Sequence, residues 1–238
     1  MATLQALLFD CDGVLVDTEK DGHRVAFNQA FAAKGLDAEW SVERYGELLH
    51  TAGGKERMCR HFDETQWPVA EPERDAFIKD LHRLKTDLFM ELIAGGELPL
   101  RPGIARIMQE AVDGGITIAV CSTSNERAVQ KIVDVLLGDE VAPHVRVFAG
   151  DMVKAKKPDP AIYLMAMDAL GLARERCLVV EDSHIGLSAA AAAGVRCLVT
   201  QSSYTSKEDF SAACRVVSDL DAADTGSLHV MDLELLLD

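Results

Sequence analysis

Basic side chains are scarce in this sequence: 24 lysines and arginines face 39 aspartates and glutamates, so the formal net charge is −15. Such a balance argues against nucleic acid or an anionic membrane as a partner. Long apolar runs are missing as well, and the start MATLQALLFD lacks the charged region of a signal peptide. We therefore expect no nucleic-acid partner and no membrane partner; a removed transit peptide would leave no trace in this sequence.

Closely spaced cysteines are also missing. The six cysteines form no CxxC pair, and four of them lie in or beside apolar runs: Cys11, Cys121, Cys177 and Cys197. This distribution favours small buried thiols in a reducing compartment over disulfides or a zinc site.

Short apolar runs that predict β-strands alternate with helical patterns along much of the chain. The expected strands are residues 4–9, 116–121, 145–149, 177–180 and 195–200. The helical patterns between the later strands are residues 125–137, 160–170 and 185–193. Asp159 and Pro160 suit a helix start, and Gly171 and Gly194 suit helix ends. Strand–helix alternation of this kind predicts a parallel sheet with helices on both faces.

The segment between the first two expected strands has a different residue pattern. Residues 19–98 read as helical and polar, contain both tryptophans, and show no convincing strand. The chain re-enters the sheet through LPLRPG, whose prolines and glycine fit a linker. We predict an α/β fold: a Rossmann-like parallel-sheet core of residues 1–18 and 99–238, with a helical cap domain, residues 19–98, inserted after the first strand.

Chemically useful side chains follow the predicted strands at the edge where open parallel sheets bind ligands. The four sets are Asp10 with Asp12, Ser122 with Thr123, Lys156 with Lys157, and Glu181 with Asp182. Each alone could serve a turn or a helix cap. Together, however, carboxylates at one sheet edge would repel one another unless a divalent cation lay between them, and Mg²⁺ binds such groups.

Two competing motifs are not favoured. An EF-hand loop needs oxygen ligands at alternate positions, and Val14 and Val16 stand there instead. The Gly-Gly-Lys of TAGGKER follows no predicted strand, and Lys55 is followed by Glu56, which argues against a phosphate-binding P-loop.

The ordered set FDCDGVLVDTE, the Ser122 strand end, Lys157-Pro158 and VVEDS resembles the four motifs of the haloacid dehalogenase superfamily. The resemblance covers essentially the whole chain, and residues 19–98 resemble the cap of the β-phosphoglucomutase and phosphoglycolate phosphatase group. Within it, the chain is most similar to CbbY-type phosphatases, which hydrolyse xylulose 1,5-bisphosphate, an inhibitor of Rubisco. The segments that carry this likeness are DTEKDGHRVAFN, YGELLHTAGGKERM, LHRLKTDLF, LPLRPG, AVCSTSN and AGDMVKAKKPDPAIY.

The resemblance implies a role for each motif residue. Asp10 is expected to attack phosphorus and form an aspartyl-phosphate, and Asp12 to act as general acid and then as general base. Ser122 and Lys157 are expected to hold the transferring phosphoryl oxygens. The expected Mg²⁺ ligands are Asp10, the backbone carbonyl of Asp12, Asp182 and, less directly, Glu181.

The cap is expected to bind the rest of a sugar phosphate, including a second phosphate that the catalytic metal does not reach. The expected substrate-binding residues are Glu19, His23, Gly53, Gly54, Lys55, Arg57, Lys85, Arg101 and Thr123. The glycines would admit backbone N–H groups to an anion. Among the cations, Lys85 alone fits a solvated helix face better than a ligand.

The sequence thus predicts a Mg²⁺-dependent phosphatase that converts xylulose 1,5-bisphosphate to xylulose 5-phosphate and phosphate. A mutase of the β-phosphoglucomutase kind, a phosphatase for another small ester and a non-enzymatic sugar-phosphate binder are the alternatives. The same likeness suggests the chloroplast stroma, with the bacterial cytoplasm as alternative. The oligomeric state stays open, a monomer being one option.

Overall fold

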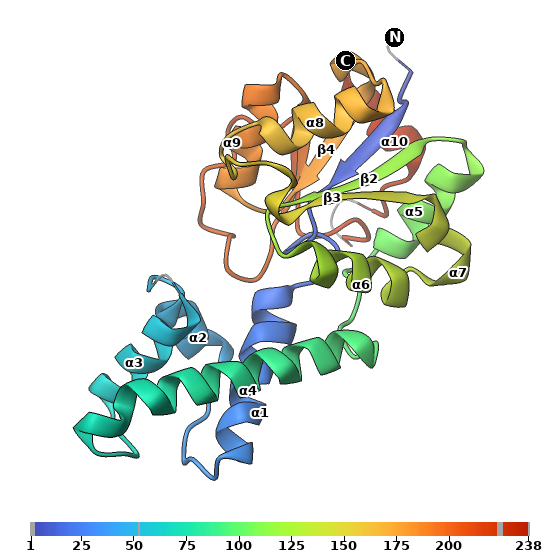
Figure 1. Cartoon of the computed structure of the whole chain (residues 1–238). Helices are drawn as coiled ribbons and strands as arrows, with labels where there is room; N and C mark the ends of the chain where they lie inside the picture. Colours follow the sequence, from blue (N-terminus) through green and yellow to red (C-terminus); the bar gives the residue numbers. More distant parts are fainter. Residues whose placement is uncertain (1–2, 52, 223–225, 238) are drawn as a thin grey trace. The chain divides into compact units, whose positions relative to one another are not determined.

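The chain folds into two compact units, which are coloured by sequence in Figure 1. One unit, here called the core unit, comprises residues 1–17 and 99–238, and the other, the cap unit, comprises residues 18–98. The computed structural model describes residues 3–51, 53–222 and 226–237.

The core unit is built on a six-stranded parallel sheet with the strand order β3-β2-β1-β4-β5-β6. The strands are β1 (Ala6–Phe9), β2 (Thr117–Ser122), β3 (Val145–Ala149), β4 (Cys177–Glu181), β5 (Arg196–Thr200) and β6 (Arg215–Val217). The predicted α/β class, with a helical segment inserted after β1, is confirmed. Strand β6 was not among the expected strands. Its three residues at the sheet edge form no apolar run long enough to detect in the sequence.

Helices cover both faces of the sheet (Figure 1). They are α5 (Ile104–Asp113), α6 (Glu126–Leu136), α7 (Gly138–Val141), α8 (Ala161–Leu170), α9 (His184–Ala193) and α10 (Val230–Glu234). Alternate strand residues such as Ala6, Leu8 and Val179 pack with α8 and α9 in one apolar cluster. Because successive strand residues point to opposite faces, Leu7, which is also fully buried, points away from that cluster. Burial on both sides explains why the strands read as continuous apolar runs.

Side chains at the strand–helix turns fix where the helices begin. The Asn125 side chain accepts hydrogen bonds from two N–H groups at the start of α6, and Ser183 does the same for the Gly186 N–H of α9. The Asp159 carboxylate accepts from the Ala161 N–H, where α8 begins. Such caps satisfy N–H groups that lack a partner within the helix, and they anchor the loops that follow the strands.

The cap unit is helical. It contains a π-helical turn (Thr18–His23) and the helices α1 (Arg24–Ala33), α2 (Val42–Leu48), α3 (Gly54–Glu64) and α4 (Arg74–Ala94). The long helix α4 packs along α1 and α3 (Figure 1). The interior of the cap unit is aromatic: Trp40 is fully buried and lies against Phe27 and Phe31. None of the helices in the described residues is long and apolar enough to span a membrane.

Candidate active site

The functional side chains of the core unit gather where its three central strands end. Asp10 directly follows β1, Ser122 is the last residue of β2, and Glu181 is the last residue of β4. In the sheet, β1 lies between β2 and β4, so the chain order reverses at this point. Open parallel sheets bind ligands at such a switch point, and all three side chains are buried there. Thr123 follows β2 and is half-buried.

Lys157 supplies the positive charge of this site. Its Nζ lies 2.7 Å from Asp10 Oδ1 and 2.6 Å from Glu181 Oε1, and it also donates to the Cys121 carbonyl at 2.9 Å. The side chain is only 7% exposed. Burial alone would lower the pKa of the Lys157 ammonium, but the carboxylates of Asp10 and Glu181 raise it above its ordinary value. Lys157 is therefore fully charged and oriented by two carboxylates.

Glu181 is held in one orientation. The Tyr163 hydroxyl donates to Glu181 Oε1 at 2.5 Å, the same oxygen that Lys157 contacts, and the Asp182 N–H donates to Oε2 at 3.3 Å. A Cβ at Gly186 would meet the Glu181 carboxylate at 2.0 Å, so the carboxylate occupies space that only glycine leaves. Glu181 thus acts mainly on Lys157, which it holds in place.

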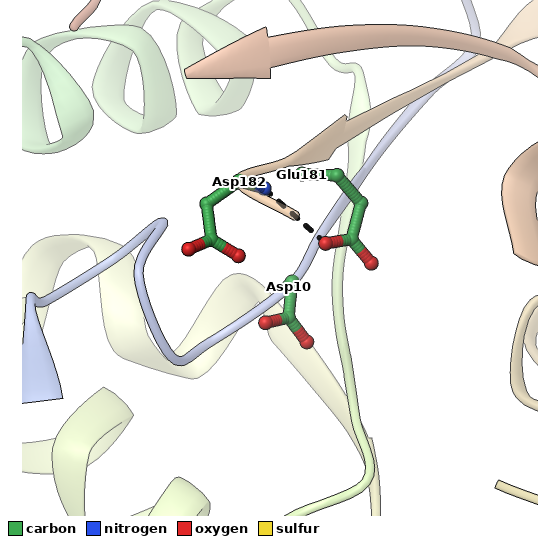
Figure 2. Close-up of side chains that lie close together, drawn as sticks. All are labelled: Asp10, Glu181 and Asp182. Atoms are coloured by element: carbon green, nitrogen blue, oxygen red, sulfur yellow. Dashed lines mark hydrogen bonds between the residues drawn. The ribbon is translucent and has the colours of Figure 1, made fainter. Parts of the chain in front are cut away.

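Asp182 faces Asp10 across the end of the sheet (Figure 2). Ligand oxygens of Asp10, Glu181 and Asp182 lie within 4.8 Å of one another. Burial raises the pKa of Asp10 well above its usual range, against the effect of Lys157, and raises that of Asp182 to about 7, against a hydrogen bond from Ser202. Two buried carboxylates that resist ionisation form a cluster whose charge a metal cation could balance.

The loop after β1 brings Asp12 and Gly13 to the same site. A Cβ at Gly13 would meet Asp182 Oδ2 at 2.0 Å, and the φ of Gly13 is +80°, so glycine is required for this approach. The Gly13 N–H donates to the Val16 carbonyl at 2.7 Å, which closes the loop. Asp12 Oδ2 accepts hydrogen bonds from the hydroxyls of Ser122, at 3.5 Å, and Ser124.

Arg101 makes its hydrogen bonds within the core unit. Its guanidinium donates to the carbonyls of Gly13, Thr200, Gln201 and Ser218, all within the core unit. Burial lowers the pKa of Arg101, and the carbonyls take up its donors. These contacts tie the loop after β1 to the end of β5. The role predicted for Arg101 in binding a distal phosphate stays a prediction, and the contacts that the structure shows for its guanidinium lie inside the core unit.

In the cap unit, Glu19 and Arg57 join a hydrogen-bonded group. The Tyr45 hydroxyl donates to Glu19 Oε2 at 2.6 Å, and Arg57 Nη1 donates to the Tyr45 oxygen at 3.2 Å. Arg57 Nη1 also lies 3.7 Å from Glu19 Oε2, and its Nε donates to the Thr51 carbonyl at 3.0 Å. The group fixes one cation and one carboxylate side by side.

Lys85 is buried, contrary to the solvated position expected for it. The residue is 7% exposed, because α4 packs along α1, and its Nζ lies 2.9 Å from His23 Nδ1. The ammonium also sits over the rings of Phe27 and Phe89, at 4.8 and 5.0 Å. Burial lowers the pKa of His23 to about 3 and that of Lys85 to about 8. His23 is therefore neutral and can accept a hydrogen bond from Lys85.

Lys55 lies apart from this group. It is exposed near the start of α3 and lines an open groove of about 450 Å³ with other side chains of α3 and α4. Arg57 is two positions further on, and helix residues two apart do not share a face. Gly53 is the N-cap of α3 and Gly54 its first residue. Of the predicted cap residues, the structure brings Glu19 into contact with Arg57 and His23 into contact with Lys85, and the charges of Glu19 and Arg57 act on Lys85.

Three residues of these groups are not among the predicted ones. Ser124 stands in the run of hydroxyl residues after β2, which is the signal that could have selected it. Tyr163 and Tyr45 are fully buried tyrosines, whose hydroxyl groups need partners. Their partners, Glu181 and Glu19, are distant in the sequence, so no local pattern pairs them.

Residues 4–194 match the haloacid dehalogenase-like hydrolase family. The chain belongs to this family and is an enzyme of its phosphatase kind. It is 43% identical to protein CbbY of Rhodobacter capsulatus over 226 residues, which cover 94% of this chain and 97% of that protein.

A CBBY-like protein of Arabidopsis thaliana is 56% identical over 209 residues, 86% of this chain; the match spans 66% of that protein's length. Among solved structures, CbbY of Rhodobacter sphaeroides, a mutant in complex with xylulose 1,5-bisphosphate, superposes with a TM-score of 0.71. The two sequences are 41% identical, and the match covers 95% of this chain and 100% of that one. The predicted resemblance to CbbY proteins is confirmed.

Proposed function

We propose that this enzyme is a Mg²⁺-dependent sugar-bisphosphate phosphatase in which Asp10 is the nucleophile. The observation that carries the proposal is the placement of Asp10: buried at the end of β1, 2.7 Å from Lys157 Nζ and close to Asp182. Lys157 keeps one carboxylate oxygen of Asp10 in a fixed place. A carboxylate so oriented is a nucleophile with little freedom to lose on reaction.

In the first step, an Asp10 carboxylate oxygen bonds to phosphorus while the bond between phosphorus and the sugar oxygen breaks. The electron pair of that bond goes to the sugar oxygen, which takes a proton from Asp12. Ser122 and Lys157 bind the phosphoryl oxygens through O–H and N–H donors. Their placement beside Asp10 supports these roles, since donors aimed at the developing charge lower the barrier.

In the second step, water attacks the aspartyl-phosphate. Asp12, now a carboxylate, takes the proton of that water, the bond between phosphorus and Asp10 breaks, and the Asp10 carboxylate is restored. One side chain thus serves as acid and then as base, as microscopic reversal of the proton transfer requires. The water-attack step separates this reading from a mutase, which would return the phosphoryl group to a sugar.

The residues around Asp10 fit a magnesium ion. Asp10 and Asp182 are carboxylates whose ionisation burial disfavours, and a divalent cation would offset that penalty. Asp10, Asp182 and the backbone carbonyl of Asp12 would hold the ion, and Glu181, engaged with Lys157, would support them. When bound, Mg²⁺ supplies positive charge for the phosphoryl oxygens.

The substrate proposed is xylulose 1,5-bisphosphate. The CbbY structure with that compound supports this choice, as does the cap-unit group of Arg57, Lys85, Glu19 and His23. Cations suit a second phosphate, and the carboxylate and imidazole suit sugar hydroxyls. The experiment is phosphate release from a panel of sugar mono- and bisphosphates, before and after chelation of divalent ions.

We expect the highest kcat/KM with xylulose 1,5-bisphosphate and no turnover after chelation until Mg²⁺ is restored. Formation of an isomer in place of phosphate would establish a mutase instead. Full turnover without any divalent ion would remove the metal from the scheme.

Removal of a Rubisco inhibitor in the chloroplast stroma is the biological role that we infer. The plant and bacterial CbbY relatives support it. Cell fractionation with an antibody to this chain tests the location: recovery outside plastids would favour the alternative, a bacterial-type cytoplasmic role.

A further inference from the structure

The carboxylate of Asp12 is held by two hydroxyl groups from the end of β2. The Ser124 hydroxyl donates to Asp12 Oδ2, and the Ser122 hydroxyl lies at the limit of hydrogen bonding, 3.5 Å from the same oxygen. The two serines are themselves linked, because the Ser124 N–H donates to Ser122 Oγ at 3.1 Å. Ser124 therefore makes the shorter of the two contacts.

The backbone of Ser124 is fixed from both sides. Ser122 ends β2, and Asn125 caps α6 by accepting from the N–H groups of Arg127 and Ala128. Gly150 packs against the same turn: a Cβ there would stand 3.3 Å from the Ser124 carbonyl. The Ser124 hydroxyl is thus presented to Asp12 from a rigid strand–helix turn, a good base for a positioning contact.

Substrate binding changes which of the two serines holds the carboxylate of Asp12. In the proposed function, Ser122 turns its hydroxyl to the phosphoryl oxygens, which removes the weaker hold on Asp12. Asp12 is half-buried, and a carboxylate can rotate about its side-chain bonds. Proton transfer requires that it lie in line with the leaving oxygen, and a small misplacement costs rate.

We propose that Ser124 is the positioning residue for proton transfer by Asp12. Its O–H donates to Oδ2 and thereby orients the carboxyl group that gives its proton to the leaving sugar oxygen. The inference rests on the proposed function, in which Asp12 is the general acid. It goes further by naming the residue that aims the acid.

The test uses leaving groups of graded basicity. A weakly basic leaving group such as 4-nitrophenolate departs without a proton, whereas an alkoxide needs one. The value of kcat/KM covers only the steps up to leaving-group departure. The series therefore comprises aryl phosphates from 4-nitrophenyl to 4-methoxyphenyl, an alkyl phosphate and xylulose 1,5-bisphosphate.

For Ser124→Ala we expect a steeper dependence of kcat/KM on leaving-group basicity than in wild type. The alkyl phosphate should lose about ten- to a hundredfold, the range of a charge-assisted hydrogen bond. The 4-nitrophenyl ester should change by less than about threefold. Ser124→Thr, which keeps the hydroxyl, should restore the wild-type slope. Ser203→Ala is the matched control, because Ser203 contacts Asp17 through its backbone N–H.

Two results would overturn the inference: an equal loss on every ester, which would mark Ser124 as a phosphoryl or folding contact, and no loss on any. Asp12→Ala separates this failure from failure of the proposed function. If Asp12→Ala steepens the slope and Ser124→Ala does not, only the inference is wrong. If Asp12→Ala leaves the slope unchanged, the assignment of the general acid is wrong.

Discussion

The core unit and the cap unit each enclose the side chain of a lysine and treat its charge in opposite ways. In the core unit, Lys157 bridges the carboxylates of Asp10 and Glu181, which raise its pKa above the ordinary value. In the cap unit, Lys85 meets a neutral imidazole, that of His23, and two aromatic rings, and burial lowers its pKa to about 8.

The difference shows which of the two lysine charges is balanced by the protein's own carboxylates. The charge of Lys157 is balanced by one aspartate and one glutamate side chain, Asp10 and Glu181, and the ammonium orients both. The charge of Lys85 is offset by Glu19, but not enough to outweigh its burial, and such a site gains from an anion supplied by a ligand. The comparison therefore supports the proposal that a phosphate binds in the cap unit.

The largest effect is expected for the nucleophile itself. Asp10→Asn keeps the shape of the side chain but removes the charged oxygen that attacks phosphorus, so kcat should fall by about 10⁴-fold or more. Phosphate release and circular dichroism, measured on the same sample, test this. A folded variant with near-normal turnover would contradict the covalent mechanism.

The next largest effect tests whether the carboxylates of Asp10 and Glu181 balance the charge of Lys157. Lys157→Met leaves Asp10 and Glu181 buried and close together without a cation, which should destabilise the protein by about 3–5 kcal/mol. Urea unfolding followed by circular dichroism measures the loss. Lys156→Met is the control, since Lys156 is exposed and pairs with Asp151 at the surface. Equal stability of the two variants would mean that the core carboxylates are not charged beside Lys157.

Much of this arrangement could be predicted from the sequence, for a physical reason. The strands are buried on both faces, so they appear as uninterrupted apolar runs, and the residues that follow them must meet at one sheet edge. This logic places Asp10, Ser122 and Asp182 without any knowledge of contacts. It fails for β6, whose three residues are too few to form a pattern.

Contacts between side chains distant in the sequence could not be predicted. The donation of Arg101 to Thr200 and Gln201 depends on how the linker meets the end of β5. The burial of Lys85 depends on the packing of α4 along α1, and α4 alone looks polar enough to expose it. Local sequence sets the period of a helix, but its neighbours decide which polar residue is enclosed.

A smaller effect is expected for the cation that lies beside Glu19. Arg57→Ala should lower kcat/KM for xylulose 1,5-bisphosphate by about one to two decades, the worth of a charged hydrogen bond. An aryl monophosphate, which has no second phosphate, should change little. Lys55→Ala, on another face of α3, should have the weaker effect of the two. Equal losses of Arg57→Ala on both substrates would point to a folding role for Arg57.

The smallest effect concerns Lys85 and depends on pH. Its pKa is about 8 in the folded protein, below the ordinary 10.5, so the folded state releases this proton first as pH rises. Between about pH 8 and 10.5 the unfolded chain binds more protons, and the free energy of unfolding therefore rises with pH in this window. Lys85→Met removes the penalty of the buried charge and keeps the apolar contact with Phe27 and Phe89.

We expect Lys85→Met to be more stable than wild type below pH 8, by roughly 1–3 kcal/mol. The advantage should shrink between pH 8 and 10.5 and vanish above pH 10.5, where the lysine is neutral in both states. Urea unfolding across this range measures it, with Lys79→Met, an exposed position on the same helix, as the control. Added inorganic phosphate should stabilise wild type more than Lys85→Met, since an anion balances a charge that only wild type carries. A variant less stable than wild type at pH 7 would show that the cap unit already compensates Lys85, and the contrast with Lys157 would not hold.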